Sequence, residues 1–524
     1  MKYKVIITTS GIGSRLGNLT KYINKALTPI GNKYAICYIL DNYPNDTEFI
    51  ITLGYFGNQV KEFLELAYPD KNFTFVTIDK YKGPGSSLGY SLLQTKKYIN
   101  CPFIYHACDS IIMDTKLPEP DKNWILGYKD GDTTQYSSFN VINNEVKNIF
   151  SKGQDIWDYV YVGVSGIYNY EKFFHYPTNR VNNKNNKELS DIHIMKDMIN
   201  SGIKFGDITA NKWYDIGNMG SLANVRKSIK NEYEVLEKLE ESICFLDNAV
   251  IKFFSNNTIC QNRVIRGNML HPLTPKILDN GDNFYKYEFS KGKLLSKYNS
   301  MDKITKLLNW CNKNLWEKYP APTHFYDLCR NFYFDKTKKR IIKFFDEHNI
   351  QDDSNIINNV EIPKVEDLLN QLDMDLLCKN EYAYQFHGDF IMDNILINKD
   401  DFILLDWRQD FGGDTKYGDI YYDLAKLKHN LFINHENVIN NLFSINIQDK
   451  VVKLDIKCNF NLISQVKQLD KFIQDNGYNL KKVNLITSLI WLNISPLHTY
   501  PLSIFLFYFG KLNLYNVLND ISYI

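Results

Sequence analysis

The sequence predicts two domains, an N-terminal α/β domain with a doubly wound, mostly parallel sheet and a C-terminal domain of the α+β class. From Lys2 to about Met219, short apolar runs alternate with amphipathic stretches, which is the pattern of parallel βαβ units. From residue 243, a second series of short strand-like runs is followed by a mostly helical remainder. The length of 524 residues also exceeds what one hydrophobic core usually serves.

The N-terminal domain is expected to occupy residues 1–240. Its strands are predicted at 4–8, 49–55, 73–78 and 103–107, and its helices at 59–67 and 86–98. Leucine, valine and isoleucine recur at helical spacing in residues 220–242, which predicts a helix that closes this domain. In parallel sheets of this kind, ligands bind at the carboxyl ends of the strands.

The C-terminal domain is expected to occupy residues 243–524. Strands are predicted at 243–247, 249–254, 275–279 and 284–289, and helices from residue 302 onward. The apolar segment 486–510 carries Asn493, Pro496 and Pro501 near its middle, and these residues are costly in a bilayer. We therefore expect buried helices there and no membrane span.

Composition excludes several classes of protein. Sixty-one basic residues balance 60 acidic ones, so the net charge of +1 gives no field that would attract a nucleic acid. The nine cysteines are scattered without a CxxC pair, which argues against a disulfide framework or a zinc site and favours reduced thiols. The N-terminal segment resembles a first strand rather than a signal peptide, so we expect a cytoplasmic protein.

A glycine-rich loop directly follows the first strand. Gly11 and Gly13 let the backbone approach a polyphosphate, and Arg15 and Lys25 can neutralise its charge. Asp109 ends the strand at 103–107, and Asp215 follows a short aromatic run. Two carboxylates of this kind can hold Mg²⁺ against phosphate groups.

This set of residues, together with Pro29, resembles the signature of the sugar-nucleotidyltransferase family. The resemblance implies a Rossmann-like domain in which Arg15 and Lys25 are catalytic and Asp109 and Asp215 hold Mg²⁺. It implies nucleotide binding by Gly11, Ile12, Gly13 and Ser14, and by Gly85, Ser86 and Ser87 in the loop 83–92. It also implies contacts of Lys152, Glu188 and Asp191 with the acceptor. The family's usual glutamine is missing from the base loop, so the nucleotide stays open, with CTP favoured.

A second motif lies in residues 384–413. His387, Asp389 and Asn394 form the pattern HxDxxxxN, and Asp406 follows twelve residues later at the end of an apolar strand. Phosphoryl transfer needs a carboxylate that accepts the proton of the attacking hydroxyl, and an Asn and an Asp on Mg²⁺. The spacing supplies all three groups.

This segment resembles the catalytic loop of the aminoglycoside-phosphotransferase and choline-kinase family. The resemblance implies a bilobal, protein-kinase-like domain with a small lobe at about 243–300 and a helical large lobe at about 301–524. Asp389 would be the base, Asn394 and Asp406 the Mg²⁺ ligands, and Lys252 the partner of the ATP phosphates, with Arg408 and Asp410 near the substrate. The chain departs from the family because residues 258–270 contain no acidic residue to hold the lysine.

The two resemblances together imply a bifunctional enzyme that uses Mg²⁺ at both sites. ATP would phosphorylate a small alcohol, polyol or sugar, and an NTP would then convert the product into an NDP-activated donor for surface glycan, such as capsular polysaccharide, or for lipid decoration. One alternative is a choline kinase fused to a phosphocholine cytidylyltransferase, although Arg408 after Trp407 disfavours a cation. Another is a nucleotidyltransferase with a degenerate, regulatory kinase-like domain. The oligomeric state stays open, a homo-oligomer included.

Overall fold

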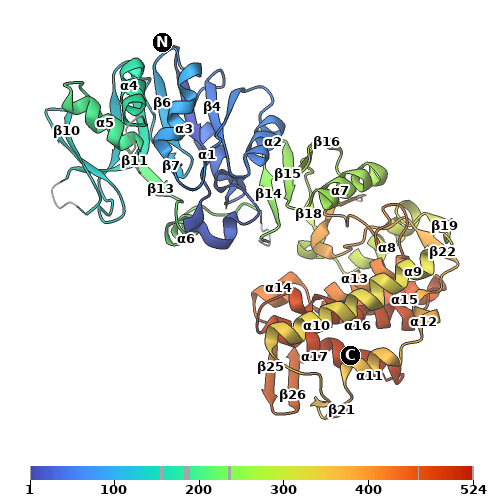
Figure 1. The fold of residues 1–524 in the computed structure, drawn as a ribbon. Coiled ribbons are helices and arrows are strands. Elements are labelled where there is room, and N and C mark those ends of the chain that lie inside the picture. The colour runs from blue at the N-terminus through green and yellow to red at the C-terminus, as the bar shows by residue number, and fades with distance from the viewer. Residues whose placement is uncertain are drawn as a thin grey trace. The chain divides into compact units, whose positions relative to one another are not determined.

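The protein is described by a computed structural model that covers residues 2–153, 157–181, 189–233, 238–399, 401–457 and 460–521. The chain divides into two compact units (Figure 1). Unit 1 comprises Met1–Cys260 and Leu278–Tyr287, and unit 2 comprises Gln261–Ile277 and Glu288–Ile524. The division therefore falls beyond residue 240, and most of the strands expected in a C-terminal small lobe belong to unit 1.

Unit 1 is built on a nine-stranded sheet whose centre is parallel. The strands β1 (Lys4–Thr8), β4 (Glu48–Leu53), β5 (Asn72–Thr77) and β6 (Phe103–Ala107) lie in the order β6-β1-β4-β5, and each neighbouring pair is parallel. This order confirms the predicted doubly wound arrangement. On the far side of β6, the sheet continues through antiparallel β11 (Tyr159–Ile167), β9 (Ser138–Ile142) and β10 (Glu145–Phe150), with β8 (Trp124–Tyr128) and β12 (Gly206–Thr209) branching from β11.

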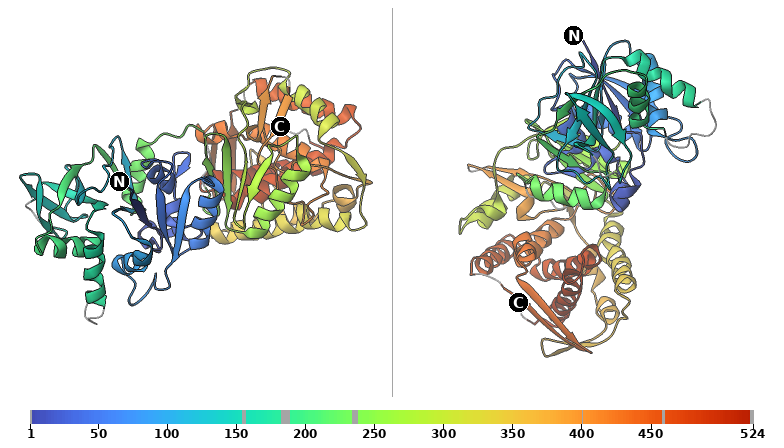
Figure 2. Two further views of the ribbon diagram at one scale, coloured as in Figure 1. Left: turned by 90° about the horizontal axis from the view of Figure 1, so that it is seen from above. Right: turned by 90° about the vertical axis from the view of Figure 1, so that its left-hand side faces the viewer.

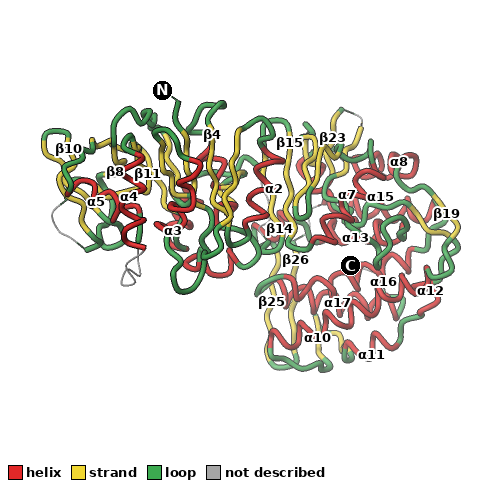
Figure 3. The backbone as a smooth tube through the Cα atoms, turned by 45° about the horizontal axis from the view of Figure 1, so that its top comes forward, coloured by secondary structure: helices red, strands yellow, loops and turns green. Residues whose placement is uncertain are grey.

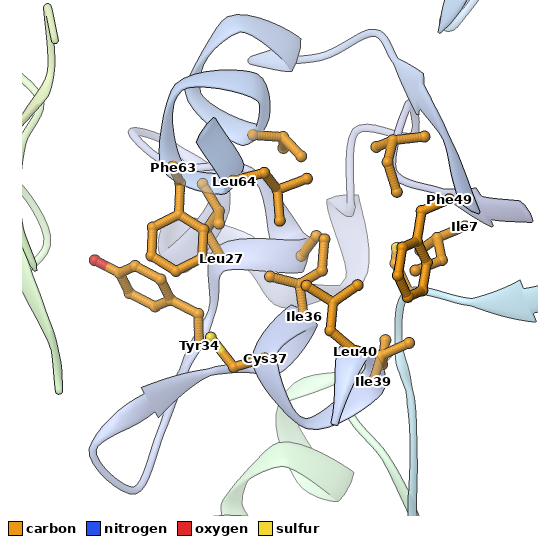
Figure 4. Packing of buried hydrophobic residues seen from close by; sticks show 14 of the residues in the cluster. Ile7, Leu27, Tyr34, Ile36, Cys37, Ile39, Leu40, Phe49, Phe63 and Leu64 are labelled. Atoms are coloured by element: carbon orange, nitrogen blue, oxygen red, sulfur yellow. The ribbon is translucent and has the colours of Figure 1, made fainter. Parts of the chain in front are cut away.

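Hydrophobic cores lie on both faces of this sheet. Because side chains alternate along a strand, Val5 and Ile7 of β1 belong to one core and Ile6 to the other. Figure 4 shows the first core, in which Phe63 and Tyr34 pack edge to face with ring centroids 4.9 Å apart. The helices of unit 1 are α1 (Ala35–Leu40), α2 (Gly57–Ala67), α3 (Leu88–Thr95), α4 (Tyr170–Val181), α5 (Asp191–Asn200) and α6 (Met219–Ser228), with 3₁₀ turns at Ser14–Thr20, Lys25–Leu27 and Lys96–Tyr98.

Two small two-stranded sheets complete the glycine-loop end of unit 1. One pairs β2 (Pro29–Ile30) with β3 (Lys33–Tyr34), and the other pairs β7 (Ser110–Met113) with β13 (Lys212–Asp215). In the second sheet Asp215 is opposite Ser110. This register brings Asp215 beside the residue that follows Asp109.

A four-stranded sheet follows in the order β14-β15-β17-β16. Its strands are β14 (Glu241–Phe245), β15 (Ala249–Phe254), β17 (Phe284–Glu288) and β16 (Ile277–Asn280). Ile251 and Phe284 are buried in the same core as Val5 and Ile7. The Glu62 carboxylate of α2 accepts hydrogen bonds from the backbone N–H groups of Asn283 and Phe284, each at 2.8 Å. Apolar burial and these hydrogen bonds explain why the strands fold with unit 1.

The helix predicted over 220–242 is too long. Helix α6 ends at Ser228, and residues 229–233 and 238–240 are not helical. The Asn32 side chain accepts hydrogen bonds from the backbone N–H groups of Glu232 and Tyr233, and the Tyr233 ring stacks on Phe245 with centroids 4.5 Å apart. These tertiary contacts override the helical spacing of the apolar residues.

Unit 2 is mainly helical (Figures 2 and 3), with short hairpins between its helices. Its helices are α7 (Asn257–Leu270, mostly in unit 2), α8 (Lys303–Asn314), α9 (Phe325–Arg330), a π-helical turn at Asn331–Asp335, α10 (Lys336–His348), α11 (Val365–Asn370), α12 (Met374–Cys378), α13 (Ile420–Phe432), α14 (His435–Ile439), α15 (Phe460–Asp475), α16 (Leu480–Ile494) and α17 (Leu502–Leu518), with 3₁₀ turns at Leu295–Lys297, Met392–Asn394 and Ser495–Leu497. Its strands are β18 (Lys293–Leu294), β19 (Lys318–Pro320), β20 (Asn355–Ile357), β21 (Val360–Ile362), β22 (Tyr382–Tyr384), β23 (Ile395–Asn398), β24 (Asp401–Leu404), β25 (Phe443–Gln448) and β26 (Val451–Ile456).

The apolar segment 486–510 forms parts of α16 and α17, which pack against each other. Trp491 and Phe505 are fully buried there. Across the described ranges, no helix combines the length and apolar character needed to cross a bilayer.

Candidate active sites

A cavity of about 440 Å³ opens at the carboxyl ends of the parallel strands of unit 1. It is lined by residues from the glycine loop, from the loop before α3, and from β6, β11 and β13. Nine of the predicted site residues line it: Gly11, Arg15, Lys25, Ser86, Ser87, Asp109, Lys152, Asp191 and Asp215. The sequence motifs are therefore brought together in one pocket.

The other predicted residues of this site do not line the cavity. Ile12, Gly13, Ser14 and Gly85 belong to the two loops but not to the wall. Gly13 has a positive φ of 70°, and a Cβ there would lie 3.1 Å from Lys25 Cβ. This conformation and the close approach of Lys25 favour glycine at this position. Glu188 lies outside the described residues.

The two carboxylates and the basic residues converge beside Gly217. A Cβ at this position would lie 3.0 Å from Asp215 Oδ1, 3.3 Å from Asp109 Oδ2 and 3.0 Å from Arg15 Nη2. The glycine thus leaves room where these three groups meet. Oxygen ligands of this kind fit Mg²⁺.

Lys25 and Asp109 form an ion pair in the wall of the cavity. Lys25 Nζ lies 3.1 Å from Asp109 Oδ2. Burial alone would raise the pKa of Asp109, but Lys25 and Arg15 overcome this effect and lower it. The pKa of Lys25 is raised because the attraction of Asp109 outweighs burial. Both groups are therefore charged at neutral pH.

Asp215 is held by its neighbours. Its Oδ1 accepts a hydrogen bond from the Gly217 backbone N–H at 3.0 Å, and its Oδ2 accepts one from the Tyr136 hydroxyl at 2.9 Å. The Tyr136 ring packs edge to face on Trp213, with centroids 4.8 Å apart. Sequence reasoning missed Tyr136 because it lies in a polar loop that carries no motif. Trp213 could have been found from the sequence, because it stands only two residues before Asp215.

Asp191 lies deep in the cavity wall at the start of α5. Its Oδ2 accepts a hydrogen bond from the Tyr161 hydroxyl at 2.6 Å. Burial raises the pKa of Asp191 to about 6, against this hydrogen bond, which lowers it. Lys152 contributes an exposed side chain to the same cavity.

The second motif forms a compact loop in unit 2. Asn394 Nδ2 donates hydrogen bonds to the Asp389 carbonyl at 2.9 Å and to Asp389 Oδ2 at 3.2 Å. Strands β23 and β24 form an antiparallel hairpin, and the Leu405 N–H donates to the Asn394 carbonyl at 2.7 Å. The residue before Asp406 is thus held against Asn394. Asn394 and Asp406 supply oxygen atoms of the type that Mg²⁺ binds.

Both carboxylates of this loop have basic partners. Lys426 Nζ of α13 lies 2.8 Å from Asp389 Oδ1, and Arg263 Nη1 of α7 lies 2.5 Å from Asp406 Oδ1. Burial opposes ionisation of Asp389, but Lys426 lowers the pKa of Asp389 to about 2. No local pattern in the sequence predicts these partners, which lie far away along the chain.

The loop backbone is anchored by Asp423 of α13. Its carboxylate accepts hydrogen bonds from the backbone N–H groups of His387 at 2.8 Å and Gly388 at 2.7 Å, and from Trp316 Nε1 at 3.1 Å. His387 Nε2 pairs with the Leu405 carbonyl at 2.8 Å, and burial lowers the pKa of His387 to about 4. His387 is therefore a neutral structural member of the loop.

The remaining predicted residues are placed as follows. Arg408 Nε donates to the Asp410 carbonyl at 3.1 Å, and Asp410 Oδ1 accepts from the Gly413 N–H at 3.2 Å. Asp410 therefore closes a turn. Lys252 lies on β15, opposite Ile243, and belongs to unit 1.

Comparisons with known proteins concern part of the chain. No protein-family model matches the sequence. A probable glucose-1-phosphate cytidylyltransferase from Bacillus subtilis is 31% identical over 134 residues, which are 24% of this chain and 50% of that protein. The chain thus spans half the length of this curated relative.

Solved structures with lower identity are also similar to the chain. A putative glucose-1-phosphate thymidylyltransferase from Bacillus anthracis has 22% identity and a TM-score of 0.37, with 45% of this chain and 98% of that chain covered. The CTP:phosphocholine cytidylyltransferase from Streptococcus pneumoniae has 21% identity and a TM-score of 0.37, with 44% and 100% covered.

Proposed function

We propose that unit 1 transfers a nucleotidyl group from an NTP to a phosphomonoester. The observation that carries this proposal is the convergence of Arg15, Asp109 and Asp215 beside Gly217, in a cavity that Lys25 also lines. The likeness to a probable cytidylyltransferase supports the same reaction class and favours CTP.

In the proposed reaction, a phosphate oxygen of the acceptor forms a bond to the α-phosphorus of the NTP. The bond between the α-phosphorus and its bridging oxygen to the β-phosphate breaks, and pyrophosphate leaves. Arg15 and the protonated Lys25 neutralise the negative charge that accumulates on the phosphates. Asp109 and Asp215 would hold Mg²⁺, which supplies further charge stabilisation when bound.

We further propose that unit 2 transfers the γ-phosphoryl group of ATP to an alcohol. The alcohol oxygen forms a bond to the γ-phosphorus, the bond from that phosphorus to the β,γ-bridging oxygen breaks, and ADP leaves. The ionised Asp389 orients the hydroxyl group and accepts its proton. Asn394 and Asp406 would hold Mg²⁺, which neutralises phosphate charge when bound.

Together the two reactions make one bifunctional enzyme. The phosphomonoester from unit 2 is the chemical type of acceptor that unit 1 consumes, and the product is an NDP-activated donor suited to surface glycan or lipid decoration. The pair of proposals is supported by two sets of charged residues in separate units, each of which contains an aspartate paired with a lysine.

A second candidate is a nucleotidyltransferase whose unit 2 binds nucleotide without turnover. The ion pair between Arg263 and Asp406 favours it, because a bound metal would have to share or displace this contact. It predicts that unit 2 binds ATP but forms no ADP with any alcohol.

The test incubates the full chain with Mg²⁺, each of the four NTPs and a panel of phosphomonoesters, and measures pyrophosphate. A parallel assay with ATP and the unphosphorylated alcohols measures ADP. Pyrophosphate and ADP, each dependent on its acceptor, are expected. If ATP binds but no alcohol leads to ADP, the second candidate is selected. If no combination of NTP and phosphomonoester releases pyrophosphate, the first proposal is refuted.

A further inference from the structure

Two basic side chains lie over one aromatic ring in unit 2. Lys336 Nζ is 4.6 Å, and Arg408 Cζ is 4.9 Å, from the centroid of the Phe332 ring. Phe332 lies in the π-helical turn Asn331–Asp335, directly before α10. Such turns are rare and occur frequently at functional sites.

Arg340 lies one helical turn after Lys336 on α10, and one of its side-chain nitrogen atoms is buried. Its Nη1 atom is shielded from solvent and forms no hydrogen bond within the described residues. A buried donor without an acceptor costs free energy, so natural structures rarely retain one without a reason. An anionic ligand would supply the missing acceptor.

The charge of Asp410 acts on the cluster of Lys336, Arg340 and Arg408, where it raises the pKa of Lys336 but does not outweigh burial and the neighbouring cations. In the part of the chain that the structure describes, none of the three lies within ion-pair distance of a carboxylate. Burial, followed by the nearby charges of Arg408 and Arg340, lowers the pKa of Lys336 to about 6. Burial and Arg408 likewise lower the pKa of Arg340. Lys336 is therefore largely uncharged at neutral pH without a ligand, and a bound anion would favour its protonated form.

The cluster adjoins the proposed catalytic base. The backbone N–H of Arg408 donates to the His387 carbonyl at 3.0 Å, and a Cβ on Gly388 would lie 2.6 Å from Arg408 Cβ. Asp389 follows directly in the chain. Lys426, the ion-pair partner of Asp389, is also close enough to depress the pKa of Lys336.

We propose that Lys336, Arg340 and Arg408 bind an anionic group, a carboxylate or a phosphate, on the alcohol that unit 2 phosphorylates. This inference rests on the proposed phosphotransferase reaction and names its substrate class. A basic cluster beside Asp389 would hold the anionic end of the acceptor while its hydroxyl group faces the base. It would also repel quaternary ammonium alcohols such as choline.

The experiment compares three alcohols of similar size on the full chain, namely glycerate, glycerol and choline. Binding is measured by calorimetry and turnover by ADP formation. Wild-type protein is expected to bind and phosphorylate glycerate, with a kcat/KM at least roughly tenfold above that for glycerol or choline. Arg340→Gln and Lys336→Gln are each expected to weaken glycerate binding about 10- to 100-fold, with an unchanged KM for ATP.

Matched variants control for folding and for charge. Lys339→Gln removes an exposed lysine from the same helix and should leave glycerate binding unchanged. Arg340→Lys keeps the charge and should recover part of the affinity that Arg340→Gln loses. A loss of affinity in Lys339→Gln equal to that in Lys336→Gln would contradict a local site.

The outcomes separate the inference from the reaction it rests on. If the wild-type protein binds glycerate without forming ADP, and Arg340→Gln abolishes this binding, the result would support the anion site and refute the phosphotransferase. Preference for glycerol or choline, or no binding of glycerate, would refute the anion site. If Arg340→Gln raised the KM for ATP by the same factor as it weakened glycerate binding, the cluster would be assigned to the nucleotide phosphates and the inference would be overturned.

Discussion

The carboxylates of Asp389 and Asp406 each form an ion pair with a basic side chain. Lys426 lies 2.8 Å from Asp389, and Arg263 lies 2.5 Å from Asp406. Lys426 keeps Asp389 ionised, which suits a group that must accept a proton. Arg263 instead occupies the carboxylate that would bind a metal, so Mg²⁺ would have to compete with or share this contact.

The first prediction compares Asp406 with Asp410 at the residue scale. Asp406→Asn should eliminate phosphorylation at saturating Mg²⁺ and ATP, because it removes a proposed metal ligand. Asp410→Asn should retain turnover and mainly raise the KM of the alcohol, since the Asp410 carboxylate accepts a hydrogen bond from Gly413 within its own turn. Steady-state ADP formation by both variants checks this, and the reverse ranking would assign the metal to Asp410.

The second prediction concerns the pH dependence of Asp191. The pKa of this carboxyl group rises from about 3.8 in the unfolded chain to about 6 in the fold. Between these values the unfolded state holds fewer protons, so the contribution of Asp191 to stability falls as the pH rises from about 4 to about 6. Asp191→Asn removes the free-energy cost of ionising this buried carboxyl group and should stabilise unit 1 by up to about 3 kcal/mol at about pH 7.5.

Urea unfolding at about pH 7.5 and about pH 4 checks the prediction for Asp191. The gain in the free energy of unfolding for Asp191→Asn should be large at the higher pH and small at the lower one. Asp130→Asn, which changes an exposed carboxylate, should leave the midpoint unchanged at both. A gain for Asp191→Asn that is equal at both pH values would refute the electrostatic explanation.

At the scale of elements, the sequence predicted the strands far better than the closing helix. The strands at 4–8 and 103–107 are short, apolar and bounded by polar residues, and they form as predicted. The segment 220–242 has helical spacing, but Asn32 and Phe245 bind residues 232–233 in another conformation. Spacing along the chain could not reveal these partners, because both lie outside the segment.

The same limit applies to the sites. Asp109, Asp389 and Asp406 could be selected from the sequence as candidates because each stands in a local motif or at a strand end. Arg263 and Lys426 were not, because their roles arise only when α7 and α13 pack beside the loop. Local patterns thus indicate which residues could carry the chemistry, and folding decides which charges surround them.

The third prediction tests the contact that ends α6. Asn32→Ala removes hydrogen bonds to the Glu232 and Tyr233 backbone N–H groups and one to the Tyr233 carbonyl. At about 1 kcal/mol for each, the free energy of unfolding should fall by about 2–3 kcal/mol. Denaturant unfolding measures this, with the exposed Asn45→Ala as a control that should change it little. A fall no greater than that of the control would contradict the proposed role of Asn32.

At the scale of the whole molecule, the two sets of proposed catalytic groups lie in different compact units. The fourth prediction follows for unit 1. Asp109→Asn and Asp215→Asn should each reduce pyrophosphate release by orders of magnitude, since each tenfold corresponds to about 1.4 kcal/mol of lost charge stabilisation. ADP formation should change far less. Near-normal pyrophosphate release from either variant would remove that carboxylate from the site.

The most direct test of the bifunctional account follows ADP and pyrophosphate in one reaction, with ATP, CTP, Mg²⁺ and an accepted alcohol. In wild-type protein, ADP should precede pyrophosphate. Asp389→Ala should form neither from the alcohol, but should release pyrophosphate at nearly the wild-type rate when the phosphorylated alcohol is supplied. Pyrophosphate from the alcohol without ADP, or no pyrophosphate from the supplied phosphomonoester in a folded Asp389→Ala variant, would contradict the account.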